Sequence, residues 1–187
     1  ESAGFHIATF ADGQPEALGS ANGGVTARID AVQQAAFSGP LTHSIIVVPE
    51  VDTVFTEPFH VATQLASLDY VTGGRAGWLV AADGSATAGA VVGRQEVTGQ
   101  GLLDEAAASI EVSRRLWDSW EDDAVIKDVA TGRYIDVDKL HYADFATDAS
   151  FAGKAYSIKG PSIIPRPLQG QLPVIVPQTL VGEAGTE

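Results

Sequence analysis

Cysteine and methionine are both absent from this chain of 187 residues. Without cysteine the chain has no disulfide, no thiolate metal ligand and no cysteine nucleophile. Not even an initiator methionine is present, and the opening ESAGFHIATFADG resembles the end of a helix turning into a strand. We therefore expect the natural N-terminus to lie upstream, in a chain that is a fragment, processed or incomplete.

Long apolar runs and basic residues are also scarce. No run reaches the ~18 apolar residues that a membrane-spanning helix needs, and no signal peptide opens the chain. We therefore expect a cytoplasmic protein without a membrane partner. Only 11 residues are Lys or Arg against 24 Asp or Glu, which gives a formal charge of -13. Because phosphate backbones are bound by clustered cations, this balance argues against a nucleic-acid partner.

Apolar strands and amphipathic helices alternate along the chain. Helical spacing covers residues 25–37, with Ile29, Val32 and Ala36 on one face, and residues 102–120. The alternation predicts an α/β protein with a parallel sheet. Four short apolar runs predict buried strands, namely residues 5–11, 44–51, 76–82 and 173–176.

The stretch TEPFHVATQLASLDYVTGGRAGW (56–78) combines several local signals. Thr56 is suited to cap a helix and Pro58 to open it, because proline lacks only a donor that the first turn does not use. Gly73 and Gly74 then end the helix. Residues 83–101 are rich in glycine and alanine, have no clear period, and predict a long loop.

Three stretches resemble the bacterial luciferase-like flavin-dependent monooxygenases, closest to the branch of nitrilotriacetate and dibenzothiophene-sulfone monooxygenases. They are the stretch 56–78 quoted above, RRLWDSWEDDAVIKDVATGRYIDVDKLHY (114–142) and KGPSIIPRPLQGQLPVIV (159–176). They occur in the family's order, and with the opening strand they span nearly the whole chain.

The resemblance implies a (β/α)₈ TIM barrel that is incomplete here. The four predicted strands would be strands two to five, in a single partial domain (1–187) with an irregular insertion at about 121–172. A complete barrel takes ~250 residues. Four strands alone would leave two exposed sheet edges, so we expect a homo-oligomer if the chain is complete.

The resemblance also assigns site residues, each with a plainer alternative. Asp12 matches an acidic position near the flavin ring, but it could equally form an Asp-Gly turn. Thr53 matches a hydroxyl position near the flavin, and its alternative is a cap before the next helix. His141 could approach substrate or lie in a surface loop. No catalytic residue is assigned, and no group has convincing metal-ligand spacing.

Other family positions are replaced in this sequence. Ala81 and Ala82 stand where the family often has two hydroxyls, and Gly99 and Leu103 stand near its flavin-binding His and Tyr. After the last strand the chain reads PQTLVGEAG, without the family's Gly-Ser-Ser-like phosphate turn. Because phosphate needs several fixed donors, these replacements reduce the side-chain ligands expected for it.

Two hypotheses about function follow. In the first, the chain is an FMN-dependent monooxygenase that receives reduced flavin from a separate NAD(P)H:flavin reductase and uses O₂ to oxygenate a small organic molecule. In the second, it is a degenerate or truncated relative that acts as a non-catalytic binding or partner subunit. A deazaflavin in the same cavity is a minor alternative to FMN.

Overall fold

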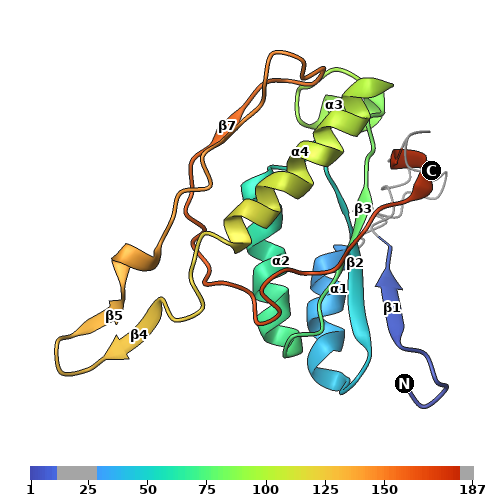
Figure 1. Ribbon diagram of the computed structural model, residues 1–187. Coiled ribbons are helices and arrows are strands. Elements are labelled where there is room, and N and C mark those ends of the chain that lie inside the picture. The colour runs from blue at the N-terminus through green and yellow to red at the C-terminus, as the bar shows by residue number, and fades with distance from the viewer. Residues whose placement is uncertain (12–28, 182–187) are drawn as a thin grey trace.

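The computed structural model describes residues 1–11 and 29–181. Its centre is a parallel sheet in the order β1-β2-β3-β8 (Figure 1). All neighbouring strands in this sheet run in the same direction, as the alternating pattern predicts. The strands are β1 (Ile7–Phe10), β2 (Ile46–Asp52), β3 (Trp78–Ala81) and β8 (Val174–Ile175).

Helices cover one face of this sheet. Helix α1 (Ala31–Ser38) packs on β2, and α2 (Pro58–Thr72) lies between α1 and α4 (Gln100–Trp117) (Figure 1). The single-turn helices η1 (Gly39–Leu41) and η2 (Val137–Lys139) lie in connections, and η3 (Gln178–Leu180) follows β8. No helix in the described ranges is both long and apolar enough to cross a bilayer.

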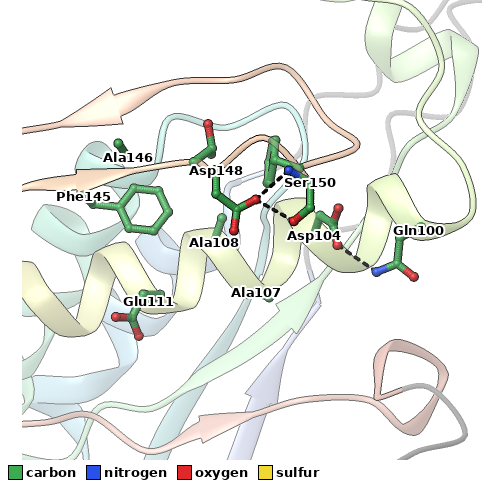
Figure 2. A pocket seen from close by; sticks show the side chains of 11 residues that line it. Gln100, Asp104, Ala107, Ala108, Glu111, Phe145, Ala146, Asp148 and Ser150 are labelled. Carbon is green, nitrogen blue, oxygen red and sulfur yellow. Dashed lines mark hydrogen bonds between the residues drawn. The ribbon is translucent and has the colours of Figure 1, made fainter.

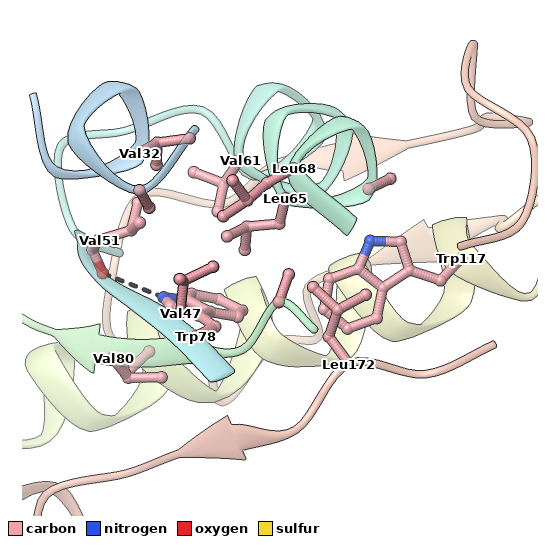
Figure 3. Packing of buried hydrophobic residues seen from close by; sticks show 14 residues of the cluster. Val32, Val47, Val51, Val61, Leu65, Leu68, Trp78, Val80, Trp117 and Leu172 are labelled. Carbon is pink, nitrogen blue, oxygen red and sulfur yellow. Dashed lines mark hydrogen bonds between the residues drawn. The ribbon is translucent and has the colours of Figure 1, made fainter. Parts of the chain in front are cut away.

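The core lies between the sheet and the helices, and two tryptophans occupy it (Figure 3). Trp78 on β3 is fully buried, and its indole N–H donates to the carbonyl of Val51 at 3.3 Å. Trp117 at the end of α4 is 1 % exposed and donates to the carbonyl of Ala62 at 3.1 Å. Each indole thus buries a large apolar surface without leaving its N–H unpaired.

The opposite face of the sheet has no such cover among the described residues. Ile7 on β1 and Ile175 on β8 point to this face and remain 49 % and 40 % exposed. Within 1–11 and 29–181 no strand pairs with the outer edge of β1 or of β8. The described residues therefore form an open sheet and not a closed barrel, as expected from the sequence.

The structure corrects some predicted boundaries. Helix α2 begins at Pro58, one residue later than a Thr56 cap implies, and its cap is Glu57, because the Glu57 carboxylate accepts the His60 N–H at 2.7 Å. Gly73 ends the helix in the left-handed region, with φ of 65°, as predicted.

Two further predictions were wrong. Ile29 precedes α1 and is 67 % exposed, so it does not belong to the buried face of that helix. The predicted loop 83–101 contains a short helix, α3 (Ala86–Val91), whose first turn is capped by Ser85. A six-residue helix of alanine, glycine, threonine and valine shows too little periodicity to be detected from the sequence.

The segment between α4 and β8 forms two antiparallel hairpins, and one of them projects away from the helices (Figure 1). The hairpins pair β4 (Val125–Asp128) with β5 (Arg133–Ile135), and β6 (Phe145–Ala146) with β7 (Ser157–Ile158).

The start of this segment is fastened to Ser162, after the second hairpin. The Trp120 indole donates to the Ser162 carbonyl at 2.8 Å, and the Ser162 N–H donates to the Ser119 hydroxyl at 2.9 Å. All three residues are buried. The insertion therefore leaves the α/β layers and returns to them at one place.

A buried aspartate joins two of the stretches that carry the family resemblance. Asp69 on α2 is fully buried and accepts the Ala76 N–H at 3.3 Å. It also accepts the backbone N–H of Gln169 at 3.1 Å and the Gln169 side-chain amide at 2.6 Å. That amide also donates to the Ala76 carbonyl at 2.9 Å. One carboxylate thus fixes the end of α2 to the connection before β8.

A second carboxylate holds the start of the chain against the sheet. Glu1 accepts the backbone N–H groups of His43, Ser44 and Ile45 at 2.7, 2.7 and 3.0 Å. These three bonds lower the pKa of the Glu1 carboxyl to about 2, because they stabilise its charged form. The first residues are thereby fixed next to the start of β2.

Candidate functional site

The carboxyl ends of β2 and β3 are joined by side chains into one rigid edge. Asp52, the last residue of β2, accepts the Asp83 N–H at 2.6 Å through one oxygen. Its other oxygen accepts the N–H groups of Val54 and Phe55 at 3.1 and 3.0 Å. In parallel α/β sheets, ligands bind outside the carboxyl ends of the strands. This edge is therefore the candidate ligand-binding site.

Thr53 lies at this edge, directly after β2. It is 1 % exposed, and both its N–H and its hydroxyl donate to the Ala81 carbonyl, at 3.0 and 2.9 Å. The hydroxyl proton is therefore occupied by the bond to Ala81. Towards a ligand, the hydroxyl oxygen can only accept a hydrogen bond. Contact between Thr53 and a flavin stays a prediction.

Asp83, after β3, was not singled out from the sequence. One of its carboxylate oxygens accepts the Ser85 N–H at 2.9 Å, and the other is buried with no hydrogen-bond partner among the described residues. A buried carboxylate oxygen without a donor is costly. A donor supplied by a ligand at the sheet edge would remove that cost.

The other two predicted site residues do not meet at this edge. Asp12 lies outside the described residues, so its role near the flavin stays a prediction. His141 lies beyond the far end of α4, where its Nε2 atom is 2.8 Å from a Glu121 carboxylate oxygen. Because α4 has 18 residues and rises 1.5 Å per residue, it separates His141 from the helix start by about 27 Å. The predicted contact of His141 with substrate is untested, and this position does not support it.

A groove lies beside the sheet edge, at the start of α4. Its volume is about 650 Å³, and we call it the α4 entrance groove. It is tied to the end of β3, because the Val97 N–H donates to the Gly84 carbonyl at 2.8 Å. Its charged lining is Arg94, which is paired with Glu105, together with Lys154 and Glu96. The complete lining is residues 93–98, Gln100, Gly101 and 152–154.

A second pocket, on the other side of the insertion, has the opposite charge (Figure 2). It has a volume of about 530 Å³ and carries the carboxylates of Asp104, Glu111 and Asp148. A hydrogen bond from Gln100 lowers the pKa of Asp104, and one from Ser150 lowers that of Asp148. Both therefore stay ionised near neutral pH and would repel a phosphate. Of these two pockets, only the α4 entrance groove has cationic side chains in its lining.

The residues present fit an FMN only in part. By the resemblance, the family's flavin-binding His and Tyr fall near Gly99, just before α4, which has no side chain to offer, and near Leu103, inside α4, which has no polar group. Lys154 could meet a phosphate in the α4 entrance groove, and the unpaired Asp83 oxygen could accept an N–H from the flavin ring. No cluster of three potential metal ligands occurs in the described part of the chain.

Sequence reasoning missed Arg94 and Glu105 as well as Lys154. The Arg94 guanidinium donates to the Val54 carbonyl at 2.6 Å and to a Glu105 carboxylate oxygen at 2.7 Å. Glu105 is only 4 % exposed. A glutamate on the buried side of a helical pattern could have been noticed from the sequence, because buried carboxylates are rare unless they are paired. Its partner Arg94 could not have been noticed, because it lies in a loop whose sequence shows no periodicity.

Comparison with known proteins gives the same family. The family model for luciferase-like monooxygenases matches residues 1–179. The N-acetyl-S-(2-succino)cysteine monooxygenase of Bacillus subtilis is 36 % identical over 137 residues, which cover 73 % of this chain and 30 % of that protein. The nitrilotriacetate monooxygenase component A of Aminobacter aminovorans is also 36 % identical, covering 73 % of this chain and 29 % of that protein. This chain therefore spans about a third of the length of these relatives.

Solved structures show the same fold. A riboflavin lyase, solved with a modified FMN and riboflavin, superposes with a TM-score of 0.76 at 27 % identity, over 94 % of this chain and 40 % of that one. A long-chain alkane monooxygenase superposes with a TM-score of 0.70 at 23 % identity, over 81 % of this chain and 34 % of that one. The described sheet is thus part of a luciferase-like TIM barrel. The chain belongs to the luciferase-like monooxygenase family.

Proposed function

We propose that this chain is the flavin-binding part of an FMN-dependent monooxygenase that oxygenates a small organic substrate. The observation that carries the proposal is the family match over residues 1–179. Relatives named for nitrilotriacetate and for dibenzothiophene sulfone support a small organic substrate. Reduced FMN, supplied by a separate flavin reductase, would provide the reaction with O₂. The protein would hold the cofactor and exclude water.

The described residues have distinct tasks in this proposal. Thr53 and Asp52 keep the ends of β2 and β3 at a fixed spacing, so the flavin ring meets a rigid edge. The unpaired Asp83 oxygen accepts an N–H of the ring. Lys154 in the α4 entrance groove attracts the phosphate. Asp12 keeps its predicted place near the ring, beyond the described residues.

A flavin titration with two ligands tests this arrangement. Fluorescence quenching gives the affinity for FMN and for riboflavin, which lacks the phosphate. Replacing Lys154→Glu should weaken FMN by about tenfold, because it exchanges an attraction for a repulsion worth roughly 1.4 kcal/mol in partly exposed surroundings. Riboflavin affinity should stay unchanged. Lys127→Glu on the β4–β5 hairpin is the matched control.

Absence of flavin binding at high micromolar concentration would contradict the proposal. A parallel titration with a deazaflavin separates that cofactor from FMN. Size-exclusion chromatography tests the homo-oligomer that we expect if the chain is complete.

The second candidate function is a non-catalytic binding or partner subunit. One observation favours it: the family's flavin-binding His and Tyr are replaced near Gly99 and Leu103. Such a subunit would bind flavin weakly or not at all. It would also leave reduced FMN to react with O₂ at the rate seen without protein, whereas an active monooxygenase changes that rate.

A further inference from the structure

Arg94 connects three segments that are distant in the sequence. One guanidinium nitrogen donates to the Val54 carbonyl at 2.6 Å, and another donates to the Glu105 carboxylate at 2.7 Å. The guanidinium carbon also lies 5.2 Å from the centre of the Phe55 ring. Val54 directly follows Thr53. A single side chain therefore fixes the loop after β2 to helix α4.

The geometry of this link requires arginine. The Arg94 guanidinium is a planar fork that can donate in two directions at once, whereas a lysine ammonium at the end of a flexible stem cannot reproduce both contacts. Val54 is fully buried, so its carbonyl needs a donor from the protein. Arg94 supplies that donor and at the same time neutralises the buried Glu105.

Glu105 is held from the other side by the insertion. A Cβ atom added to Gly153 would lie 2.7 Å from a Glu105 carboxylate oxygen and 2.7 Å from the Phe151 ring. Gly153 does not have a positive φ, so contact and not backbone conformation demands glycine there. The Glu105 carboxylate is therefore confined between Arg94 and the insertion.

We infer that Arg94 and Glu105 are positioning residues, which set the loop 53–57 and with it the place of Thr53 at the flavin edge. The inference rests on the proposed function, because Thr53 matters to the reaction only if a flavin binds beside it. Arg94 acts here through the Val54 carbonyl and not by touching the flavin. The insertion takes part because it determines where Glu105 can lie.

Hydrogen–deuterium exchange tests the positioning without any flavin. In Arg94→Lys and Glu105→Gln, the amides of residues 54–57 should exchange about tenfold faster than in the parent, while the amides of β2 and β3 stay unchanged. Gly153→Ala should give the same local pattern, because it displaces Glu105 without altering either member of the pair. Arg114→Lys, at an exposed position of α4, is the matched control.

Flavin affinity provides the functional readout. Arg94→Lys and Gly153→Ala should weaken FMN and riboflavin by the same factor, about tenfold, because a displaced loop affects the ring that both ligands share. A loss confined to FMN would make Arg94 a direct phosphate ligand and overturn the inference.

The two proposals fail in different ways. If the parent protein binds no flavin, the proposed function is wrong, and exchange at residues 54–57 still decides whether the pair orders the loop. Parental exchange rates at these residues in Arg94→Lys and Glu105→Gln would refute the positioning role. Faster exchange spread equally over the sheet would also refute it, because the pair would then serve only the stability of the fold.

Discussion

Replacing Asp69 by asparagine should weaken the fold strongly without changing the shape of the side chain. The carboxylate accepts three hydrogen bonds, from the Ala76 N–H and from two donors of Gln169. Asparagine keeps one acceptor oxygen and turns an NH₂ group towards a donor. The side chain at position 69 is fully buried, so water cannot reach it to replace the hydrogen bond that asparagine no longer accepts.

The magnitude follows from these bonds. Two bonds change from charged to neutral acceptors at about 1 kcal/mol each, and the third leaves a donor unpaired at about 2 kcal/mol. The free energy of unfolding should therefore fall by about 4 kcal/mol. At about 2–4 °C per kcal/mol for a chain of this size, the midpoint of thermal unfolding should fall by about 8–16 °C.

Thermal and urea unfolding, followed by circular dichroism and tryptophan fluorescence, measure this loss. Asp138→Asn on η2 is the matched control, because that aspartate is exposed, and it should change stability by less than about 0.5 kcal/mol. Gln169→Ala completes a double-mutant cycle, in which the two losses should not add. An unchanged midpoint in Asp69→Asn would refute the argument, since it would mean that these bonds add nothing to stability.

Three further predictions concern pH and the core. The lowered pKa of Glu1 means that its bonds stabilise the fold above pH 4.5 and are lost as pH falls towards 2, so Glu1→Gln should flatten the dependence of the thermal midpoint on pH in this window. Burial, and then the charges of two nearby glutamates, raise the pKa of Tyr156. Stability should therefore fall as pH rises above 10, and Tyr156→Phe should lessen that fall, as measured by urea unfolding. Trp117→Leu should cost about 3–5 kcal/mol, because it leaves a cavity and removes the indole bond to the Ala62 carbonyl, and the same assay checks it. A loss below about 1 kcal/mol would contradict the packing described here.

The sequence predicted the layers well, because buried strands and helices leave periodic signals. The four parallel strands and the end of α2 at Gly73 were found in this way. The cap of α2 was misplaced by one residue, since threonine and glutamate can both accept a helix N–H. Helix α3 was missed because its short, small-residue sequence has no apolar stripe.

The long-range side-chain contacts could not be predicted from the sequence, for a different reason. The Asp69–Gln169 bonds join residues 100 positions apart, and the Arg94–Val54 bond joins residues 40 positions apart. Neither pairing leaves a local pattern. Thr53 was placed correctly at the sheet edge, but the direction of its hydroxyl depends on the Ala81 carbonyl of a neighbouring strand.

The fastening of the insertion also has a consequence for how such a chain can change over evolutionary time. Trp120 and Ser162, 42 positions apart, meet at one point and close a loop, whose β4–β5 hairpin lies outside the core cluster that Ala143 forms with Ala62, Val112 and Leu116. Doubling the length of a flexible loop costs only about 0.6 kcal/mol. The β4–β5 hairpin can therefore be lengthened, shortened or exchanged while the sheet and its helices persist. Because Gly153 of the same insertion presses on Glu105, an exchange at Gly153 would also readjust the loop that carries Thr53.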